Sequence, residues 1–186
     1  MATLPFKDTA LANREELARR WALAAEPSPD DARGPHWQLL LREFLWPLEP
    51  ARRLVGPPLQ IAAARNPKTV MLLPGFGAHP IRMRWMARKL EKAGHTTKKW
   101  GLGYNLGATE ARFRKVESRL VELHRVKGQP IHLVGWSLGG VMARELAKAH
   151  PDKVAKVITM GSPFSGSPRA NNGWRAYQAI AGHRVD

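Results

Sequence analysis

Cysteine is absent from the 186-residue chain, which excludes disulfide bonds, thiolate nucleophiles and cysteine-bound metal sites. Acidic residues are scarce, since 15 Asp and Glu stand against 30 Lys and Arg and leave a net charge of +15. No apolar run is long enough for a signal-peptide core or a membrane span. We therefore expect a cytoplasmic protein, either soluble or peripheral to a membrane. A hydrophobic fraction of 44% is sufficient for a globular core and excludes general disorder.

Charged residues are distributed unevenly along the chain, and a stretch of loop-forming residues separates its N-terminal part from the rest. Residues 67–186 contain 21 of the basic and 7 of the acidic residues, whereas residues 1–66 contain 9 and 8. The stretch 26–35 is rich in proline and charge, as is typical of a loop. We therefore predict a loosely ordered N-terminal segment with an opening helix at 1–35, an amphipathic helical extension at 36–66 and a core domain at 67–186.

The extension has a distinct apolar pattern. Its hydrophobic residues between His36 and Val55 recur at helical spacing, interrupted by Pro47 and Pro50. This pattern predicts a kinked amphipathic helix. We favour a helix that packs over the main core, and an interfacial membrane helix is the alternative.

Strand and helix patterns alternate along the core. The predicted strands are 69–73, 96–100, 131–134 and 154–160. The predicted helices run from 81 to 93, from a cap at Thr109 to Gly128, and from a glycine-rich turn to His150. This alternation predicts an α/β fold with a parallel sheet, right-handed crossovers and helices on both faces of the sheet.

A candidate nucleophile lies between the third predicted strand and the helix that follows it. The sequence Gly-Trp-Ser-Leu-Gly-Gly at 135–140 matches the pattern Gly-x-Ser-x-Gly of a nucleophile elbow. The turn raises the serine hydroxyl above the sheet, and glycines at 135 and 139 remove side chains where the turn is crowded. We predict Ser137 as the nucleophile, with Gly135 and Gly139 as the elbow glycines. A glycine-rich turn with an incidental serine is the alternative.

A second glycine-rich loop, Leu-Leu-Pro-Gly-Phe-Gly-Ala-His at 72–79, directly follows the first strand. Such a loop can turn a backbone amide toward the serine, and the residue after the nucleophile supplies a second amide. Phe76 and Leu138 are the candidate oxyanion-hole residues. Each donor contributes about 3 kcal/mol to transition-state stabilisation in acyl transfer. A plain turn between strand and helix is the alternative for this loop.

Three segments together resemble the α/β-hydrolase fold, specifically its esterase, lipase and acyltransferase-like members. They are Leu-Leu-Pro-Gly-Phe-Gly, Val-Gly-Trp-Ser-Leu-Gly-Gly and Val-Ile-Thr-Met-Gly-Ser-Pro-Phe-Ser-Gly. The resemblance implies that Ser137 attacks a carboxylic ester or lipid without a cofactor, and it leaves hydrolysis and acyl transfer open. A noncatalytic relative that binds a lipid or a protein is the alternative function.

The sequence departs from this family after the serine. Such hydrolases place an Asp or Glu and then a His after the nucleophile. The residues of these types after Ser137 are Glu145, His150, Asp152, His183 and Asp186. None fits the role, because Glu145 is better explained as a surface partner of Lys148 and the others occupy an exposed turn or the chain end. The chain therefore resembles a hydrolase core that is incomplete at its C-terminus, and we do not expect full hydrolase rates.

Several expectations about partners follow from strand 154–160 and from the charge. An apolar edge strand at 154–160 predicts an oligomer or a missing partner that covers it. The basic helices are best explained as solvated faces, and with the 36–55 helix they favour docking on anionic membranes. No nucleic-acid module is present, so we expect no specific nucleic-acid binding. No His, Asp and Glu grouping has metal-ligand spacing, so we predict no metal.

Overall fold

The computed structural model describes residues 6–27, 61–163, 169 and 174–184. It divides into two compact units, one drawn from Met1–Leu40 with Ser165–Asp186 and the other from Leu41–Phe164. The amphipathic helix expected at 36–55 lies outside the described residues, and the predicted domain limits at 35 and 66 stay predictions. No helix in the described part of the chain is long and apolar enough to cross a bilayer.

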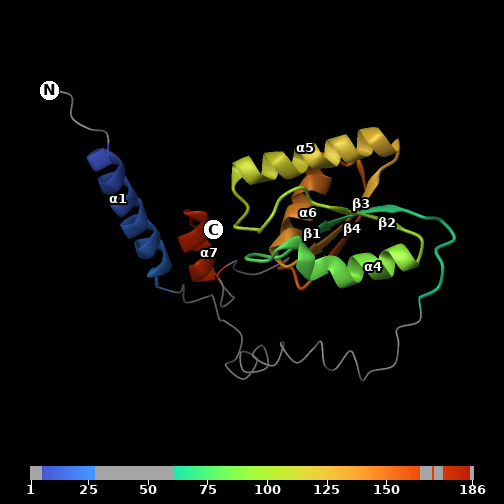
Figure 1. Cartoon of the computed structure of the whole chain (residues 1–186), viewed down its shortest axis with the longest axis horizontal. Coiled ribbons are helices and arrows are strands. Elements are labelled where there is room, and N and C mark those ends of the chain that lie inside the picture. The colour runs from blue at the N-terminus through green and yellow to red at the C-terminus, as the bar shows by residue number, and fades with distance from the viewer. Residues whose placement is uncertain (1–5, 28–60, 164–168, 170–173, 185–186) are drawn as a thin grey trace, which may run out of the picture. The chain divides into compact units, whose positions relative to one another are not determined.

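The larger unit is built on a four-stranded parallel sheet (Figure 1). Its strands are β1 (Thr69–Leu73), β2 (Thr96–Lys99), β3 (Ile131–Trp136) and β4 (Val154–Met160). They lie in the order β2-β1-β3-β4, and each neighbouring pair is parallel. The predicted α/β fold with a parallel sheet is therefore confirmed, including the full extent of the strand at 154–160.

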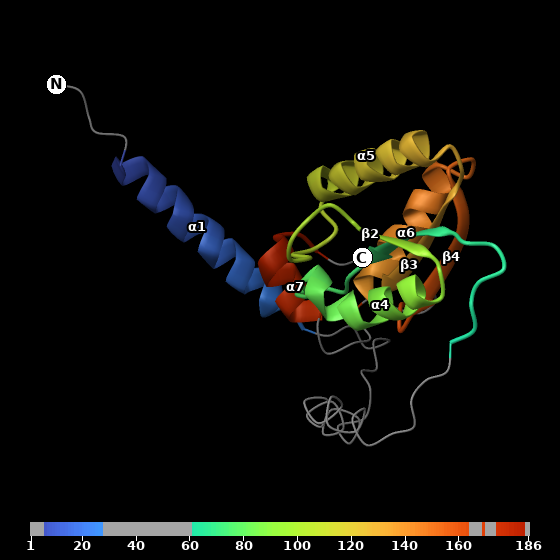
Figure 2. The ribbon, with the colours of Figure 1, turned by 45° about the vertical axis from the view of Figure 1, so that its right-hand side comes forward.

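Helices cover both faces of this sheet, as predicted (Figures 1 and 2). They are α4 (Arg84–Lys92), preceded by the short helix η2 (Pro80–Met83), α5 (Glu110–Lys127) and α6 (Leu138–Ala149). On one face, α5 and α6 pack against a buried core that includes Met71, Leu73, Ile131 and Leu133. On the other face, the apolar side of α4 packs against a smaller cluster of Val70, Leu72 and Val134. Alternate residues of β1 thus contribute to opposite cores, as the two-residue repeat of a strand requires.

The ends of α5 follow from its sequence. The Thr109 hydroxyl accepts a hydrogen bond from the Arg112 amide at 3.4 Å, which caps the first turn. At the other end, Gly128 adopts a φ of 62°, and its amide donates to the His124 carbonyl. Glycine takes this left-handed conformation without a Cβ clash, so the helix ends there as predicted.

Strand β4 lies at one end of the described sheet, because it pairs with β3 alone in the strand order. On the face that carries α4, the side chains of Ile158 and Trp136 are 46% and 37% exposed. The apolar edge strand expected from the sequence is therefore present in the described residues. The partner expected to cover it stays a prediction.

The smaller unit contains α1 (Phe6–Ala24) and α7 (Trp174–Ala181). Polar contacts join the two helices. Arg20 donates to the Ile180 carbonyl at 2.8 Å, and Arg19 donates to the Gly182 carbonyl at 2.9 Å. These cations satisfy carbonyls at the end of α7, where the helix dipole favours positive charge. The opening helix expected near the N-terminus is thus present as α1.

Candidate functional site

Ser137 occupies the turn between β3 and α6 with an unusual backbone conformation. Its φ of 51° and ψ of −121° make it the one non-glycine residue with a positive φ in the described part of the chain. Such a conformation costs about 1–3 kcal/mol and persists where the surroundings hold it in place. The Ser137 amide donates to the Met160 carbonyl of β4 at 2.9 Å, which ties the turn to the end of the neighbouring strand.

Glycines make this turn sterically feasible. A Cβ on Gly135 would lie 2.4 Å from the Gly139 carbonyl oxygen and equally close to the backbone of Gly140. A Cβ on Gly139 would lie 2.2 Å from the Leu73 carbonyl oxygen. At both positions the new Cβ would clash with backbone atoms, so no side-chain rotation could relieve the clash. Helix α6 therefore approaches the ends of β1 and β3 closely enough that only glycine fits at 135 and 139.

The loop after β1 lies against the serine turn. A Cβ placed on Gly75 would be 3.2 Å from the Ser137 Cβ and 3.2 Å from the Trp136 carbonyl oxygen. Phe76 follows in this loop, while Leu138 is the first residue of α6, where an amide N–H has no acceptor within its own helix. The structure thus brings together the two segments that carry the candidate oxyanion residues. The role of the Phe76 and Leu138 amides stays a prediction.

Asn105 holds this loop in place, and no sequence motif pointed to it. Its buried side chain donates from Nδ2 to the Pro74 carbonyl at 2.7 Å. Its backbone carbonyl accepts from the Gly77 amide at 2.7 Å, and its amide donates to the Ala78 carbonyl at 3.0 Å. Asn105 thus takes part in three hydrogen bonds, two as donor and one as acceptor, which fix the segment that contains Phe76. The Asn105 contacts are long-range, so only the folded structure reveals them.

Ser162 is a second supporting residue, and its sequence context did not indicate this role. Its hydroxyl donates to the Ser137 carbonyl oxygen at 2.7 Å, and the Gly140 amide donates to the same oxygen at 2.9 Å. A Cβ on Gly140 would lie 1.9 Å from the Ser162 Oγ, so glycine at 140 makes room for this contact. Ser162 therefore helps to hold the strained carbonyl of the candidate nucleophile.

The residues considered for an acid or a base make other contacts. Glu145 accepts a hydrogen bond from Lys148 at 2.8 Å, as expected from their spacing. His150 Nε2 lies 2.7 Å from Glu117 Oε1 of α5. A hydrogen bond from Lys153 lowers the pKa of Asp152 below its ordinary value. These contacts satisfy the side chains on the surface of the larger unit.

The remaining two candidates belong to the end of the chain. His183 Nε2 lies 3.1 Å from the Tyr177 hydroxyl within the smaller unit. Asp186 lies outside the described residues. In the parts of the chain that the structure describes, no histidine or carboxylate is hydrogen-bonded to Ser137 Oγ. No group of three or more His, Asp and Glu with metal-binding geometry occurs among the described residues.

The chain is similar to known proteins over part of its length. A family model described as alpha/beta hydrolase fold matches residues 73–179, more than half of the chain. The pimeloyl-[acyl-carrier protein] methyl ester esterase of Aliivibrio salmonicida is 30% identical over 114 residues, which cover 59% of this chain and 41% of that protein. The biotin biosynthesis bifunctional protein BioHC of Teredinibacter turnerae is 37% identical over 62 residues, which cover 33% of this chain and 10% of that protein.

A solved structure is similar over part of the chain. The monoacylglycerol lipase of Paleococcus ferrophilus matches with a TM-score of 0.46 and 22% identity, covering 66% of this chain and 49% of that one. The present chain therefore spans less than half the length of each of these three proteins.

Proposed function

The chain belongs to the alpha/beta hydrolase fold family, and on this premise we propose that it is a serine hydrolase of the esterase type with Ser137 as its nucleophile. The observation that carries this proposal is the strained backbone of Ser137 at the strand-to-helix turn, with a φ of 51°. A serine in this position presents its hydroxyl above the carboxyl end of the sheet. The hydroxyl is also available, because Ser137 makes no side-chain capping bond to α6.

The proposed reaction is ester hydrolysis through a covalent acyl-serine intermediate. Ser137 Oγ forms a bond to the acyl carbon while its proton passes to a base. The negatively charged oxygen of the tetrahedral intermediate accepts hydrogen bonds from the amides of Phe76 and Leu138. The bond to the alcohol then breaks, the alcohol leaves with a proton, and water attacks the acyl-serine to release the acid.

The substrate class that we propose is a carboxylic ester. Support comes from the A. salmonicida relative, whose name describes a methyl ester esterase. Methyl and p-nitrophenyl esters of short acyl groups are therefore the first substrates to assay. Acyl transfer differs from hydrolysis only in the group that attacks the acyl-serine. Added glycerol separates the two reactions, because a transferase forms a glycerol ester and a hydrolase forms the free acid.

A fluorophosphonate probe tests the nucleophile directly. We expect the full chain to be labelled at Ser137, and Ser137→Ala to abolish the labelling. Ser118→Ala is the matched control, because Ser118 is an exposed serine of α5 whose hydroxyl bonds only to its own helix at the Arg114 carbonyl. Labelling should be measured with and without imidazole, which supplies a base in solution.

The two outcomes of this experiment are distinct. Labelling of the wild type and of Ser118→Ala, but not of Ser137→Ala, supports the proposal with or without imidazole. Equal labelling of all three, or no labelling even with imidazole, rejects Ser137 as a nucleophile. In the latter case, ester binding that is unchanged in Ser137→Ala identifies the chain as a noncatalytic binding relative.

A further inference from the structure

The surface formed by η2, α4 and β2 has an unbalanced positive charge. Residues 80–99 contain seven Lys and Arg and a single acidic residue, Glu91. Glu91 accepts a hydrogen bond from the Thr97 hydroxyl at one end of α4. Helix α5 differs, because two of its cations form ion pairs with carboxylates on the same helix, namely Arg114 with Glu110 and Arg119 with Glu122. Among the described residues, no cation of α4 forms such an ion pair with a carboxylate.

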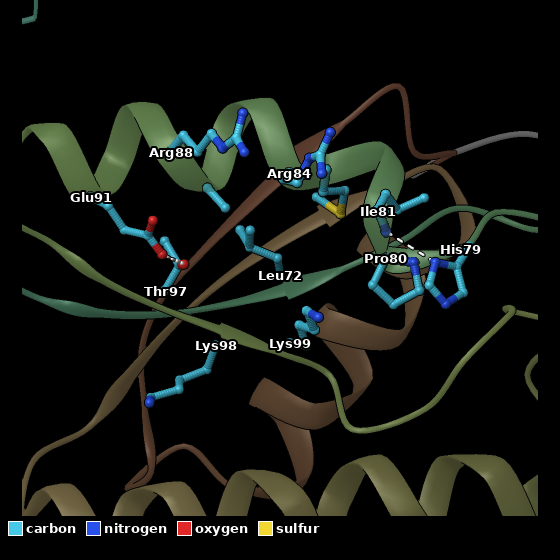
Figure 3. Close-up of a pocket in the computed structure, with 12 residues that line it drawn as sticks. Leu72, His79, Pro80, Ile81, Arg84, Arg88, Glu91, Thr97, Lys98 and Lys99 are labelled. Carbon is cyan, nitrogen blue, oxygen red and sulfur yellow. Dashed lines mark hydrogen bonds between the residues drawn. The ribbon is translucent and has the colours of Figure 1, made fainter.

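A groove of about 290 Å³ lies between α4 and β2 on this surface (Figure 3). Arg84 and Arg88 line one wall, one helical turn apart on α4, and Lys99 lines the other wall from β2. The structure gives these three cations no carboxylate partner among the described residues. Guanidinium and ammonium groups of this kind are therefore free to bind an anion.

The groove also has an apolar floor. Leu72 of β1 and Met83 of η2 are each about 95% buried and line it beneath the cations. His79 and Pro80 lie at one end of the groove, and the hydrogen-bonded pair of Glu91 and Thr97 lies at the other (Figure 3). The groove therefore combines a charged rim with an apolar interior, an arrangement that suits a ligand with an anionic group attached to carbon atoms.

We propose that this groove is a binding site for a phosphate monoester. On the α4 side of the sheet, Arg84, Arg88 and Lys99 supply three positive charges to the groove and Glu91 supplies one negative charge. Lys98 also lines the groove, but its side chain extends away from α4 (Figure 3) and is not included in this charge. The net charge of two is matched by a phosphate monoester, which carries about −1.5 to −2 at neutral pH. A carboxylate would leave one cation unbalanced. Arginine forks also match the geometry of phosphate oxygens, because two parallel N–H groups can donate to them.

The charged residues of this groove differ from those of the proposed esterase site, although the segment 72–79 contributes Leu72 and His79 to the groove and Phe76 to the candidate oxyanion hole. The charged walls of the groove belong to α4 and β2, whereas Ser137 lies between β3 and α6. The proposal of phosphate binding therefore does not depend on whether Ser137 is a nucleophile. Two kinds of molecule present a phosphate monoester, namely a small soluble metabolite and the headgroup of phosphatidic acid in a membrane.

The strand β2 supplies a matched control for the groove. Lys98 also borders the groove, next to Lys99, but its register partner is Met71, which belongs to the core beneath α5 and α6. Its side chain accordingly extends away from α4 (Figure 3). Lys99 is paired with Leu72, whose side chain lies on the α4 face. Replacing either lysine by alanine lowers the net charge by one, so only the position of the charge differs.

The experiment measures binding of glycerol 3-phosphate to the full chain by calorimetry at about 0.15 M salt, where attraction between charges more than about 8 Å apart is largely screened. We expect Lys99→Ala and Arg88→Ala each to weaken binding about tenfold, which corresponds to about 1.4 kcal/mol. Lys98→Ala and Arg125→Ala, the second an exposed arginine of α5, should weaken it less than twofold. All four residues are at least partly exposed, and unfolding midpoints check that the variants remain folded.

Vesicles distinguish the two sources. Binding to vesicles that contain phosphatidic acid, with the same ranking of variants but no binding of glycerol 3-phosphate, identifies the lipid headgroup. Binding of glycerol 3-phosphate with that ranking identifies a soluble ligand. An equal loss in all four variants means general attraction to a basic protein and overturns the site. Absence of binding to both probes overturns it as well.

Discussion

Replacing Gly139 by alanine tests the close packing that places Ser137 at its turn. The new Cβ would lie 2.2 Å from the Leu73 carbonyl oxygen and 2.6 Å from the Pro74 carbonyl oxygen. Both atoms belong to the backbone at the end of β1, which is buried and paired on both sides. The alanine can be accommodated only if α6 moves away from the sheet by about 1 Å, since nonbonded carbon atoms pack about 3.5–4.0 Å from their neighbours.

The cost can be worked out from two opposing terms. Overpacking of a core by one group costs about 1–3 kcal/mol, and contacts with backbone place Gly139→Ala at the upper end. Alanine is favoured over glycine in a helix by about 1 kcal/mol, which offsets part of this cost. We therefore expect a net loss of about 2 kcal/mol in the free energy of unfolding. With a urea dependence of about 2 kcal/mol per M, the midpoint falls by about 1 M.

Urea denaturation followed by circular dichroism measures this loss. Gly103→Ala is the matched control, because its Cβ would meet no atom within 4 Å and its φ lies outside the left-handed region. That substitution should change the free energy of unfolding by less than about 1 kcal/mol, and chiefly through the unfolded chain. If Gly139→Ala unfolded at the same urea concentration as the wild type, α6 could not approach β1 as closely as the structure shows.

Three further predictions concern residues around the same sheet. Asn105→Ala removes the donor to the Pro74 carbonyl, so it should cost about 1–3 kcal/mol in urea denaturation and slow fluorophosphonate labelling of Ser137. Ser162→Ala removes the hydroxyl that bonds the Ser137 carbonyl and should cost about 1 kcal/mol and slow labelling, whereas Ser118→Ala should do neither. Burial, with Lys68, His95 and Lys156 nearby, lowers the pKa of His132 below 6.5. The unfolded chain therefore binds this proton more tightly, and stability falls as the pH drops below about 6.5. His132→Leu should lose less stability between pH 7 and pH 5.5, and an equal loss would contradict this assignment.

The sheet and its helices could be predicted from the sequence because their signals are local. The strand at 154–160 matches β4 residue for residue, and Thr109 and Gly128 mark the two ends of α5. Apolar runs, caps and glycine stops each depend on neighbours within a few residues. The order of the strands in the sheet, β2-β1-β3-β4, was not predicted from the sequence, because right-handed crossovers between parallel strands allow more than one order. The Gly-x-Ser-x-Gly pattern between strand and helix predicted a nucleophile at Ser137, and the resemblance of three short motifs to a known family added the expectation that it attacks an ester.

The supports of the site could not be predicted, because they join residues far apart in the sequence. Asn105 bonds Pro74 across 31 positions, and Ser162 bonds Ser137 across 25. Asn105 belongs to no motif, and Ser162 lies in one of the three segments that resemble the family, but nothing in that segment indicates a hydrogen bond to Ser137. Asparagine and serine in loops are common, so their partners become evident only when the backbone is folded. The groove between α4 and β2 was missed for the same reason, since its cations come from two elements.

Thr109 and Ser137 differ in how each hydroxyl is used at the start of a helix. Both residues immediately precede a helix. Thr109 has an extended backbone, with φ −67° and ψ 152°, and its hydroxyl caps the helix by accepting from Arg112. Ser137 has a strained backbone and makes no capping bond, although serine is among the best capping residues. The backbone of Ser137 is thus strained, and its hydroxyl makes no capping bond that would stabilise α6. The proposed role of this hydroxyl as a nucleophile gives a reason for both features.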